Sequence, residues 1–259
     1  MKRAPPSLLR FIAMLALCTL ALQLVFAARI AMMRFVDPQS TSFQRSEIWR
    51  LLVEKRSIDW SQQWVAGTQI SPNLKRAVIA SEDAGFAEHS GVEWDALEKA
   101  WERNQRAEAR VTKLNERALR QAAKPTAAPP SKPLIEPKVV GGSTITQQLA
   151  KNLFLAGERS LPRKAQEFII TLMLEAMLNK SRILEIYLNS VEWGEGLFGA
   201  EAAAHHYFHV SAAQLSPMAA ARLAVMLPAP KRFEKRPDSA YAASRAGTVA
   251  ARMGAVEVP

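Results

Sequence analysis

The chain has 259 residues, of which 49% are hydrophobic and 22% are charged. This composition excludes a mostly disordered chain, and the length suits one domain of ordinary to large size, with room for an appendage. The formal net charge of +10 suggests an anionic partner: nucleic acid, anionic lipid or a phosphorylated substrate. The single cysteine, Cys18, excludes an internal disulfide and a cysteine-rich zinc site.

The excess positive charge is confined to two segments. Residues 1–34 carry +5 and residues 103–138 carry +6, so that the rest of the chain is close to neutral at −1. This distribution disfavours a uniformly basic nucleic-acid-binding domain, and we expect no nucleic acid among the partners.

The first basic segment contains an uncharged run, Phe11–Ala28, in which Thr19 and Gln23 are the only clearly polar residues. About 18–20 such residues in a helix can cross the roughly 30 Å hydrocarbon core of a bilayer. The run therefore predicts a transmembrane anchor within residues 1–34, with a short cytoplasmic tail before it. A signal peptide cleaved after Val25-Phe26-Ala27 is the alternative. In both cases the rest of the chain crosses the membrane, and we expect a single-pass protein of the cytoplasmic membrane with residues 35–259 on its outer, periplasmic face.

Beyond the anchor, helical signals dominate and no convincing strand pattern with a period of two is present, so the sequence predicts an all-α fold. Ser71-Pro72 is typical of a helix start and predicts a helix over Asn73–Ser81 that ends near Glu82-Asp83. Thr144 and Gln147 have the spacing of a capping box and predict a helix to about Phe154. The other predicted helices begin near Trp94 and at Pro162, or lie over Ser181–Asn189, around 199–208 and around 211–226.

Two stretches lack a clear helical signal. Residues 35–70 are mixed in composition, and we expect them to connect the anchor to the core. Residues 125–137, PTAAPPSKPLIEP, contain five prolines and predict a loop or linker within the basic segment.

Two carboxylates lie where catalysis could use them. Glu82 is at the predicted C-terminus of a helix, whose dipole tends to raise the pKa of a carboxyl group and so suits a general acid or base. Glu167 follows Arg163 and Lys164 by one helical turn, on the same face, so two cations beside one carboxylate could bind a phosphate. A solvated helix end and a surface salt bridge are the ordinary alternatives.

The stretch GGSTITQQLAKN at residues 141–152 is typical of an anion site. Its glycines allow close backbone approach, the helix N-terminus offers free N–H groups, and Thr144, Gln148 and Lys151 line one face of the helix. Together with the two carboxylates, these donors favour a membrane-bound enzyme that acts on an anionic sugar, with a glycosyl diphosphate as the donor.

At these residues the chain resembles the peptidoglycan glycosyltransferases of glycosyltransferase family 51. The motifs that carry the resemblance occur in order over roughly residues 75–230: ASEDAGFAEHSG, GGSTITQQLAKNLFL, RKAQE, KSRILEIYLN and GAEAAAHHYF. The resemblance implies a lysozyme-like helical domain that polymerises lipid II, a polyprenyl-diphosphate-linked disaccharide-peptide. The 4-hydroxyl of lipid II attacks the anomeric carbon of the growing strand, forms an inverted β-1,4 link and releases the polyprenyl diphosphate.

By motif position, the resemblance implies that Glu82 is the general base on the acceptor hydroxyl and that Glu167 is a second essential glutamate near the leaving diphosphate. It implies substrate binding or diphosphate stabilisation by Ser143, Thr144, Gln148, Lys151, Arg163 and Lys164, and a site shaped by Asp83, Phe86 and His89. Family members often use Mg²⁺ or Mn²⁺, but no ligand set is visible and the metal stays open. The implied partners are lipid II, the lipid-linked glycan strand, membrane lipid and wall-synthesis proteins.

The bifunctional members of the family carry a second, penicillin-binding domain. This chain contains neither Ser-x-x-Lys nor Lys-Thr-Gly, the motifs of that chemistry, and so resembles the monofunctional biosynthetic transglycosylases. It departs from the family in the long, basic insert at about 103–138. We interpret this insert as a flexible arm that contacts anionic lipid headgroups or the substrate diphosphate; a tolerated, solvated insertion is the alternative.

Two other functions stay open at this point. A lysozyme-like lytic hydrolase of peptidoglycan would also be helical and glutamate-based, but it would not need the cations Lys151, Arg163 and Lys164. A catalytically silent scaffold for wall synthesis would not need the intact catalytic positions.

Overall fold

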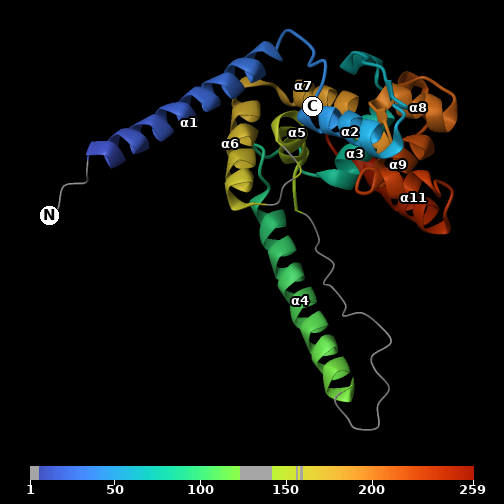
Figure 1. Cartoon of the computed structure of the whole chain (residues 1–259). Helices are drawn as coiled ribbons and strands as arrows, with labels where there is room; N and C mark the ends of the chain where they lie inside the picture. Colours follow the sequence, from blue (N-terminus) through green and yellow to red (C-terminus); the bar gives the residue numbers. More distant parts are fainter. Residues whose placement is uncertain (1–5, 123–141, 156, 158–159) are drawn as a thin grey trace. The chain divides into compact units, whose positions relative to one another are not determined.

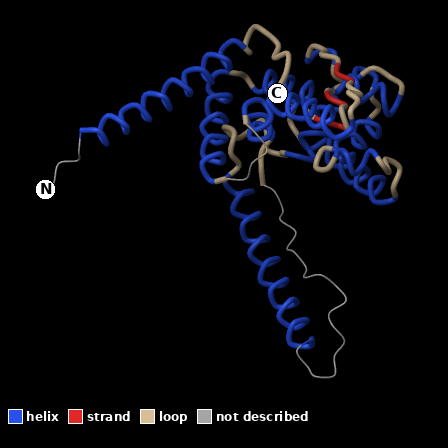
Figure 2. Tube along the Cα trace, viewed as in Figure 1, coloured by secondary structure: helices blue, strands red, loops and turns tan. Residues whose placement is uncertain are grey.

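The computed structural model describes residues 6–122, 142–155, 157 and 160–259, and the chain forms two compact units. Unit 1 combines Met1–Gly91 with Thr144–Pro259, and unit 2 is Val92–Ser143. The described residues are mostly helical, so the predicted all-α class is confirmed (Figures 1 and 2).

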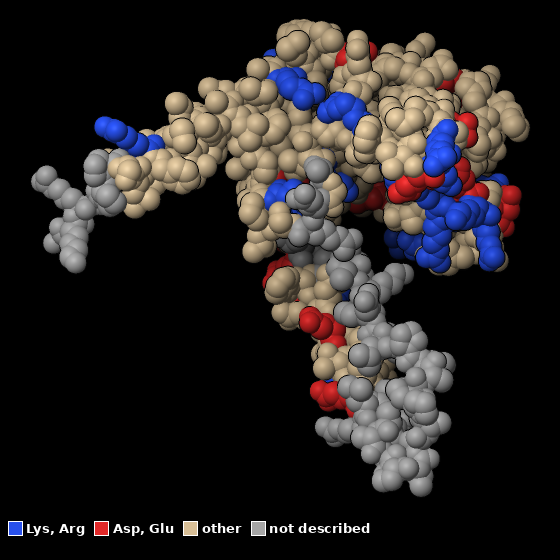
Figure 3. Space-filling view, in the orientation of Figure 1, with Lys and Arg blue, Asp and Glu red and all other residues tan. Residues whose placement is uncertain are grey.

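Unit 1 begins with α1 (Pro6–Met32), which is long and apolar enough to cross a membrane. All its residues from 7 to 22 are exposed, and most of its surface carries no charge (Figure 3). An apolar helix of this length that is not covered by protein suits the hydrocarbon core of a bilayer. The helix therefore fits the predicted single-pass anchor.

Local capping signals set the starts of the two helices that carry the first motifs. Ser71 caps α3 (Pro72–Glu82), which ends at Glu82 as predicted. Thr144 and Gln147 form the predicted capping box of α5 (Ile145–Phe154), in which each side chain accepts the other residue's backbone N–H.

The remaining helices of unit 1 include three that the sequence did not predict, namely α2, α10 and α11. The helix expected over 211–226 is split into a 3₁₀ turn and a separate helix, because Ser216 caps a new start and a proline occupies its first turn. The elements are α2 (Ser42–Arg50) with a π-helical turn (Leu51–Lys55), α6 (Leu161–Met177), α7 (Lys180–Ser190), α8 (Ala200–Phe208), α9 (Pro217–Met226), α10 (Pro230–Glu234), α11 (Ala240–Arg252) and 3₁₀ turns at Gly67–Gln69, Ala212–Gln214 and Met253–Ala255.

Three short strands were also not predicted from the sequence. They are β1 (Ser61–Gln62), β2 (Glu192–Gly194) and β3 (Leu197–Phe198), in the order β1-β3-β2. β1 runs parallel to β3, and β2 runs antiparallel to it. Strands of two or three residues are too short to display a period of two.

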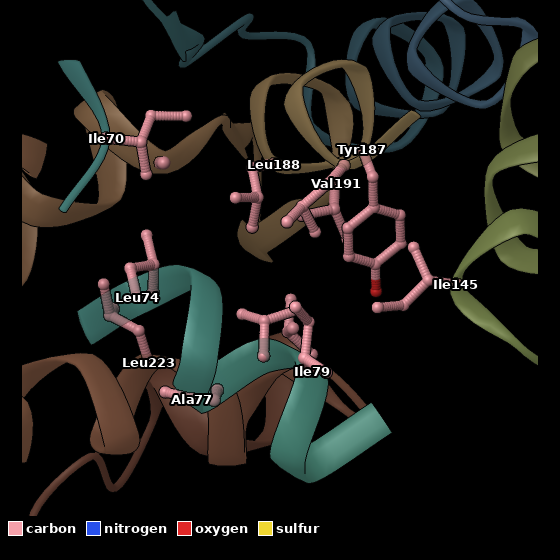
Figure 4. Packing of buried hydrophobic residues seen from close by; sticks show 14 of the residues in the cluster. Ile70, Leu74, Ala77, Ile79, Ile145, Tyr187, Leu188, Val191 and Leu223 are labelled. Carbon is pink, nitrogen blue, oxygen red and sulfur yellow. The ribbon is translucent and has the colours of Figure 1, made fainter. Parts of the chain in front are cut away.

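The core of unit 1 brings the end of α3 against the helices of the later motifs. α3 packs against α9 and α11, while α5 packs against α2, α6 and α7. Figure 4 shows Tyr187 of α7 and Ile145 of α5 beside Ile79 of α3, and all three side chains are fully buried. Because Glu82 follows Ile79 by less than one turn, this packing fixes its position.

A cluster of two buried carboxylates and one partly exposed lysine joins α2 to β2 and α10. The ammonium group of Lys231 contacts the carboxylate of Glu47 and lies 3.4 Å from Oε1 of Glu192. Burial is the largest influence on Glu192 and raises its pKa to about 7, while Lys231 opposes the rise.

Unit 2 contains α4 (Trp94–Ala122), the helix predicted to begin near Trp94 and to run into the basic segment. Residues 103–122 of the basic insert are helical, and its role as an arm that contacts lipid or substrate stays a prediction. Residues 123–138, including the proline-rich stretch, lie outside the described residues.

Candidate active site

Glu82 lies at the C-terminal end of α3 with its side chain partly buried. Its Oε2 accepts a hydrogen bond of 2.9 Å from Nε2 of Gln148 on α5. Burial raises the pKa of Glu82, the hydrogen bond from Gln148 opposes this, and the charge of Asp83 adds to the rise. The direction agrees with the sequence-based expectation, although the main cause is burial and not the helix dipole that the sequence suggested.

Tyr187 is a residue of the site that sequence reasoning missed. Its hydroxyl donates a 2.9 Å hydrogen bond to Oε1 of Gln148, which turns the amide NH₂ of Gln148 toward Glu82. Within the helix predicted over Ser181–Asn189, apolar periodicity places the ring of Tyr187 on the apolar face and gives no role to its hydroxyl. Its hydroxyl was the available signal, because a buried phenol usually needs a hydrogen-bond partner.

Asp83 anchors the loop that follows α3. Its Oδ1 lies 2.7 Å from Nε2 of His89, and its Oδ2 accepts the backbone N–H of Ile145 at 2.9 Å. The N–H of Gly91 donates to Nδ1 of His89 at 3.1 Å, so the hydrogen of the ring lies on Nε2 and is donated to Asp83. Phe86 is fully buried and packs edge-on against His89. These contacts bring Asp83, Phe86 and His89 together after the end of α3, and their role in shaping the site stays a prediction.

The N-terminus of α5 is not open to an anion in the way the sequence suggested. The N–H of Ile145 donates to Asp83, and the N–H of Gln147 donates to the hydroxyl of Thr144. The Thr144 hydroxyl in turn donates to the carbonyl oxygen of Gly91 at 2.6 Å. The prediction of free N–H groups is therefore wrong for these two residues, because the Asp83 carboxylate accepts one N–H and the capping hydroxyl of Thr144 accepts the other.

Glu167 of α6 forms the second half of the site. Its carboxylate is buried, accepts a 2.8 Å hydrogen bond from Nη1 of Arg163 at Oε2, and contacts the ammonium group of Lys164 at Oε1. This is the cluster that the spacing on the helix predicted. The buried Nε of Arg163 has no hydrogen-bond partner among the described residues.

Lys151 completes this cationic group from α5. Partial burial is the main cause that lowers its pKa; the carboxylate of Glu167 raises it, and the charges of Arg163 and Lys164 lower it further. Three cations around one carboxylate leave a formal charge of +2 for an anionic ligand. Ser143, the remaining candidate residue, is the last residue of unit 2, whereas the other candidates belong to unit 1.

The two halves of the site are joined by α5. Gln148 reaches Glu82, and Lys151, three residues later, lies in the field of Glu167. Residues three apart share one face of a helix, so the same face presents an amide to one carboxylate and a cation to the other. The arrangement can remove a proton at one end and stabilise an anion at the other.

Comparison with known proteins agrees with this geometry. Residues 52–112 and 132–254 match the family model described as Transglycosylase. The chain is 49% identical to the biosynthetic peptidoglycan transglycosylase of Paraburkholderia phytofirmans over 247 residues, which cover 95% of this chain and 91% of that protein. It is 50% identical to proteins of the same name from Burkholderia thailandensis and Burkholderia pseudomallei, over 93% of this chain and 83% of each relative. The chain belongs to the transglycosylase family, whose domain is lysozyme-like.

Proposed function

We propose that this chain is a monofunctional peptidoglycan glycosyltransferase that polymerises lipid II into β-1,4 glycan strands, with Glu82 as the general base. The activity follows from the family and from the names of relatives that align over most of their length. The observation that carries the residue-level proposal is the common face of α5, which links the raised-pKa carboxyl of Glu82 to the cations around Glu167.

In the proposed reaction, the 4-hydroxyl of lipid II is the acceptor. Its oxygen attacks the anomeric carbon of the growing strand, and its proton passes to the carboxylate of Glu82. A base is most effective when its pKa lies near the working pH, and burial moves Glu82 in that direction. Gln148, oriented by Tyr187, holds the carboxylate in place by its hydrogen bond.

The bond from the anomeric carbon to the diphosphate breaks as the new bond forms on the opposite face, so the configuration inverts. The leaving polyprenyl diphosphate takes the electron pair, and Lys151, Arg163 and Lys164 stabilise its charge. Glu167 orders two of these cations in the absence of substrate. No step of the proposal runs through a metal ion.

The membrane arrangement is part of the proposal. The N-terminus lies in the cytoplasm, α1 crosses the membrane, and the catalytic unit works on the outer face, where its lipid-linked donor and acceptor share the bilayer with the anchor. The positive residues that precede the apolar run favour this orientation.

The test is to supply the full chain in proteoliposomes with lipid II and, separately, with purified sacculi. We expect glycan strands and free lipid diphosphate from lipid II, and no soluble muropeptides from sacculi. Release of muropeptides without strand formation would identify a lytic hydrolase. No product from either substrate would favour a silent scaffold.

A further inference from the structure

The second half of α1 packs against the catalytic helices. Gln23, Phe26, Ile30 and Met33 are spaced three or four residues apart and therefore share one face of the helix. Ile30 and Met33 are buried and the other two are half-buried, whereas residues 7–22 are all exposed. The helix thus changes, at Gln23, from a segment that no protein covers to a segment that packs against other helices of unit 1.

Residues along this face contact α5 and α6, which carry the candidate catalytic residues, and the neighbouring helix α7. Phe26 meets Phe154, the last residue of α5, edge-to-face with ring centroids 5.2 Å apart. The guanidinium group of Arg29 lies over the same ring at 5.1 Å. Arg182 of α7 donates from Nε to the carbonyl oxygen of Met33 at 2.9 Å.

The polar contact on this face is a reciprocal pair of amides. Gln23 donates from Nε2 to Oε1 of Gln166 at 2.7 Å, and Gln166 donates back to Oε1 of Gln23 at 2.9 Å. Gln23 lies inside the uncharged run Phe11–Ala28, where lipid offers no hydrogen-bond partner. A polar residue in such a span is costly unless a protein group satisfies it.

The partner of Gln23 lies next to the catalytic machinery. Gln166 immediately precedes Glu167 on α6 and is one turn from Arg163. The amide pair therefore ties a fixed depth of the membrane helix to the helix that carries the diphosphate-binding cations.

We propose that Gln23 and Gln166 are positioning residues, which hold α6 at the membrane depth where the diphosphate of a lipid-linked substrate lies. This inference rests on the proposed function for the identity of the substrate. A diphosphate that is held by its lipid at the level of the headgroups can meet Lys164 and Arg163 only if α6 keeps a fixed height relative to the bilayer. The face of α1 that contains Gln23, Phe26 and Ile30 holds α6 at that height, and the amide pair determines which residues of α1 and α6 lie side by side.

The test begins with Gln23→Leu and Gln166→Leu, each of which leaves one amide without its partner. We expect each single variant to lower kcat/KM for lipid II in proteoliposomes by about tenfold, because an unpaired polar group loses its compensation in apolar surroundings. The double variant replaces both amides by apolar groups of similar size, and we expect it to recover to within about threefold of wild type. Thr19→Leu is the matched control: Thr19 is the other polar residue of the run, and its hydroxyl bonds only within α1, to the carbonyl oxygen of Leu15.

Two readouts separate positioning from a general loss of fold. The first is the dependence of activity on bilayer thickness, measured in vesicles with short, intermediate and long acyl chains. Wild type and Thr19→Leu should share one optimum, and the single variants should have a flatter or displaced one, because hydrophobic mismatch then moves α1 without moving α6 equally. Single variants that match wild type in rate and optimum would overturn the proposal, as would a double variant that loses as much as the two singles combined.

The second readout does not need catalysis. In a Cys18→Ser background, Gln23→Cys with Gln166→Cys should accept a thiol cross-linker about as long as the two glutamine side chains that it replaces, and the cross-linked protein in membranes should retain activity. Absence of the cross-link in folded protein, or a cross-linked protein that loses its activity while the form without the cross-link keeps it, would refute the docked geometry. If wild type itself makes no strands from lipid II, the proposed function fails while the cross-link still reports on docking.

Discussion

Glu82 and Glu167 are both carboxylates beside the same helix, α5, but their surroundings differ. Glu82 is met by the neutral amide of Gln148, and burial raises its pKa. Glu167 is more fully buried, yet it is held between the guanidinium group of Arg163 and the ammonium group of Lys164. The surroundings of the first carboxylate favour gain of a proton, whereas the second contacts two cations and orders them.

This difference is consistent with the two roles proposed for the same residue type. A carboxylate that loses water without gaining a cation is destabilised as an anion and becomes a better base near neutral pH. A carboxylate that loses water and gains two cations becomes part of an electrostatic frame. The comparison therefore predicts that the two glutamates will fail differently when each is made neutral.

The largest effect is expected for Glu82→Gln. Loss of the base should lower polymerisation of lipid II by about 10³-fold, within the range usual for general acid–base catalysis. Its thermal stability at neutral pH should be equal to or above that of wild type, because the variant no longer buries an ionisable carboxyl group. A variant that keeps full activity would contradict the assignment of the base.

Glu167→Gln should lower both activity and stability. We expect activity to fall by about 10²-fold, because the cations lose the group that orders them. The free energy of unfolding should fall by roughly 1–3 kcal/mol, less than for a fully buried pair because Lys164 is half exposed. Chemical denaturation of the two glutamate variants in parallel is the measurement. If the two variants have the same free energy of unfolding, the surroundings of the two glutamates do not differ in the way that we infer.

The pH dependence of kcat/KM should report the amide next to Glu82. Because the Gln148 hydrogen bond stabilises the ionised carboxylate, Gln148→Leu should raise the pKa further and move the acid limb of the profile to higher pH. Tyr187→Phe should move it in the same direction by less and reduce the rate by about tenfold at most, since the amide then loses only its orientation. If the acid limb stays at the same pH in both variants, the group that titrates in the profile is not Glu82.

The smallest effect on activity is expected for Glu192→Gln, which serves as a control for burial alone. Glu192 also has a raised pKa, about 7, but lies in the cluster with Glu47 and Lys231. Activity should stay within about twofold, as for most changes away from a site. The sign for stability follows from linkage: a carboxyl group with a raised folded pKa favours folding below its ordinary value of 4.5, and this contribution is lost as the pH rises to about 7. Stability measured from pH 4 to 8 should therefore decline less in the variant, by an amount on the order of 1–3 kcal/mol.

The sequence predicted what short-range chemistry determines. Ser71-Pro72 and the capping box of Thr144 and Gln147 fixed two helix starts, because capping depends on residues within one turn. The spacing of Arg163, Lys164 and Glu167 likewise predicted contacts that one helix forms by itself.

Hydrogen bonds between residues that are far apart in the sequence could not be predicted in the same way. The bond from Gln148 to Glu82 joins residues 66 positions apart, and the bond from Ile145 to Asp83 joins residues 62 positions apart. No local pattern indicates that Asp83 accepts an N–H group at the N-terminus of α5. The sequence therefore predicted that these N–H groups were free to bind a substrate anion. The hydroxyl bond of Tyr187 to Gln148 could not be predicted either, because apolar periodicity reflects the ring and not the hydroxyl.

Gly91 and Thr144 mark the points where the chain leaves unit 1 and returns to it. The hydroxyl of Thr144 donates to the carbonyl oxygen of Gly91, so these two points are joined by a 2.6 Å hydrogen bond. Gly91 has φ +85°, and a Cβ there would lie 2.8 Å from side-chain atoms of Thr171 and Glu175, so only glycine fits this exit. Closing a longer loop between fixed ends costs only about 0.6 kcal/mol for each doubling of its length. A change in the length of residues 113–131, the part of unit 2 that the family model leaves unmatched, would therefore cost little as long as this hydrogen bond holds the two ends of the unit together.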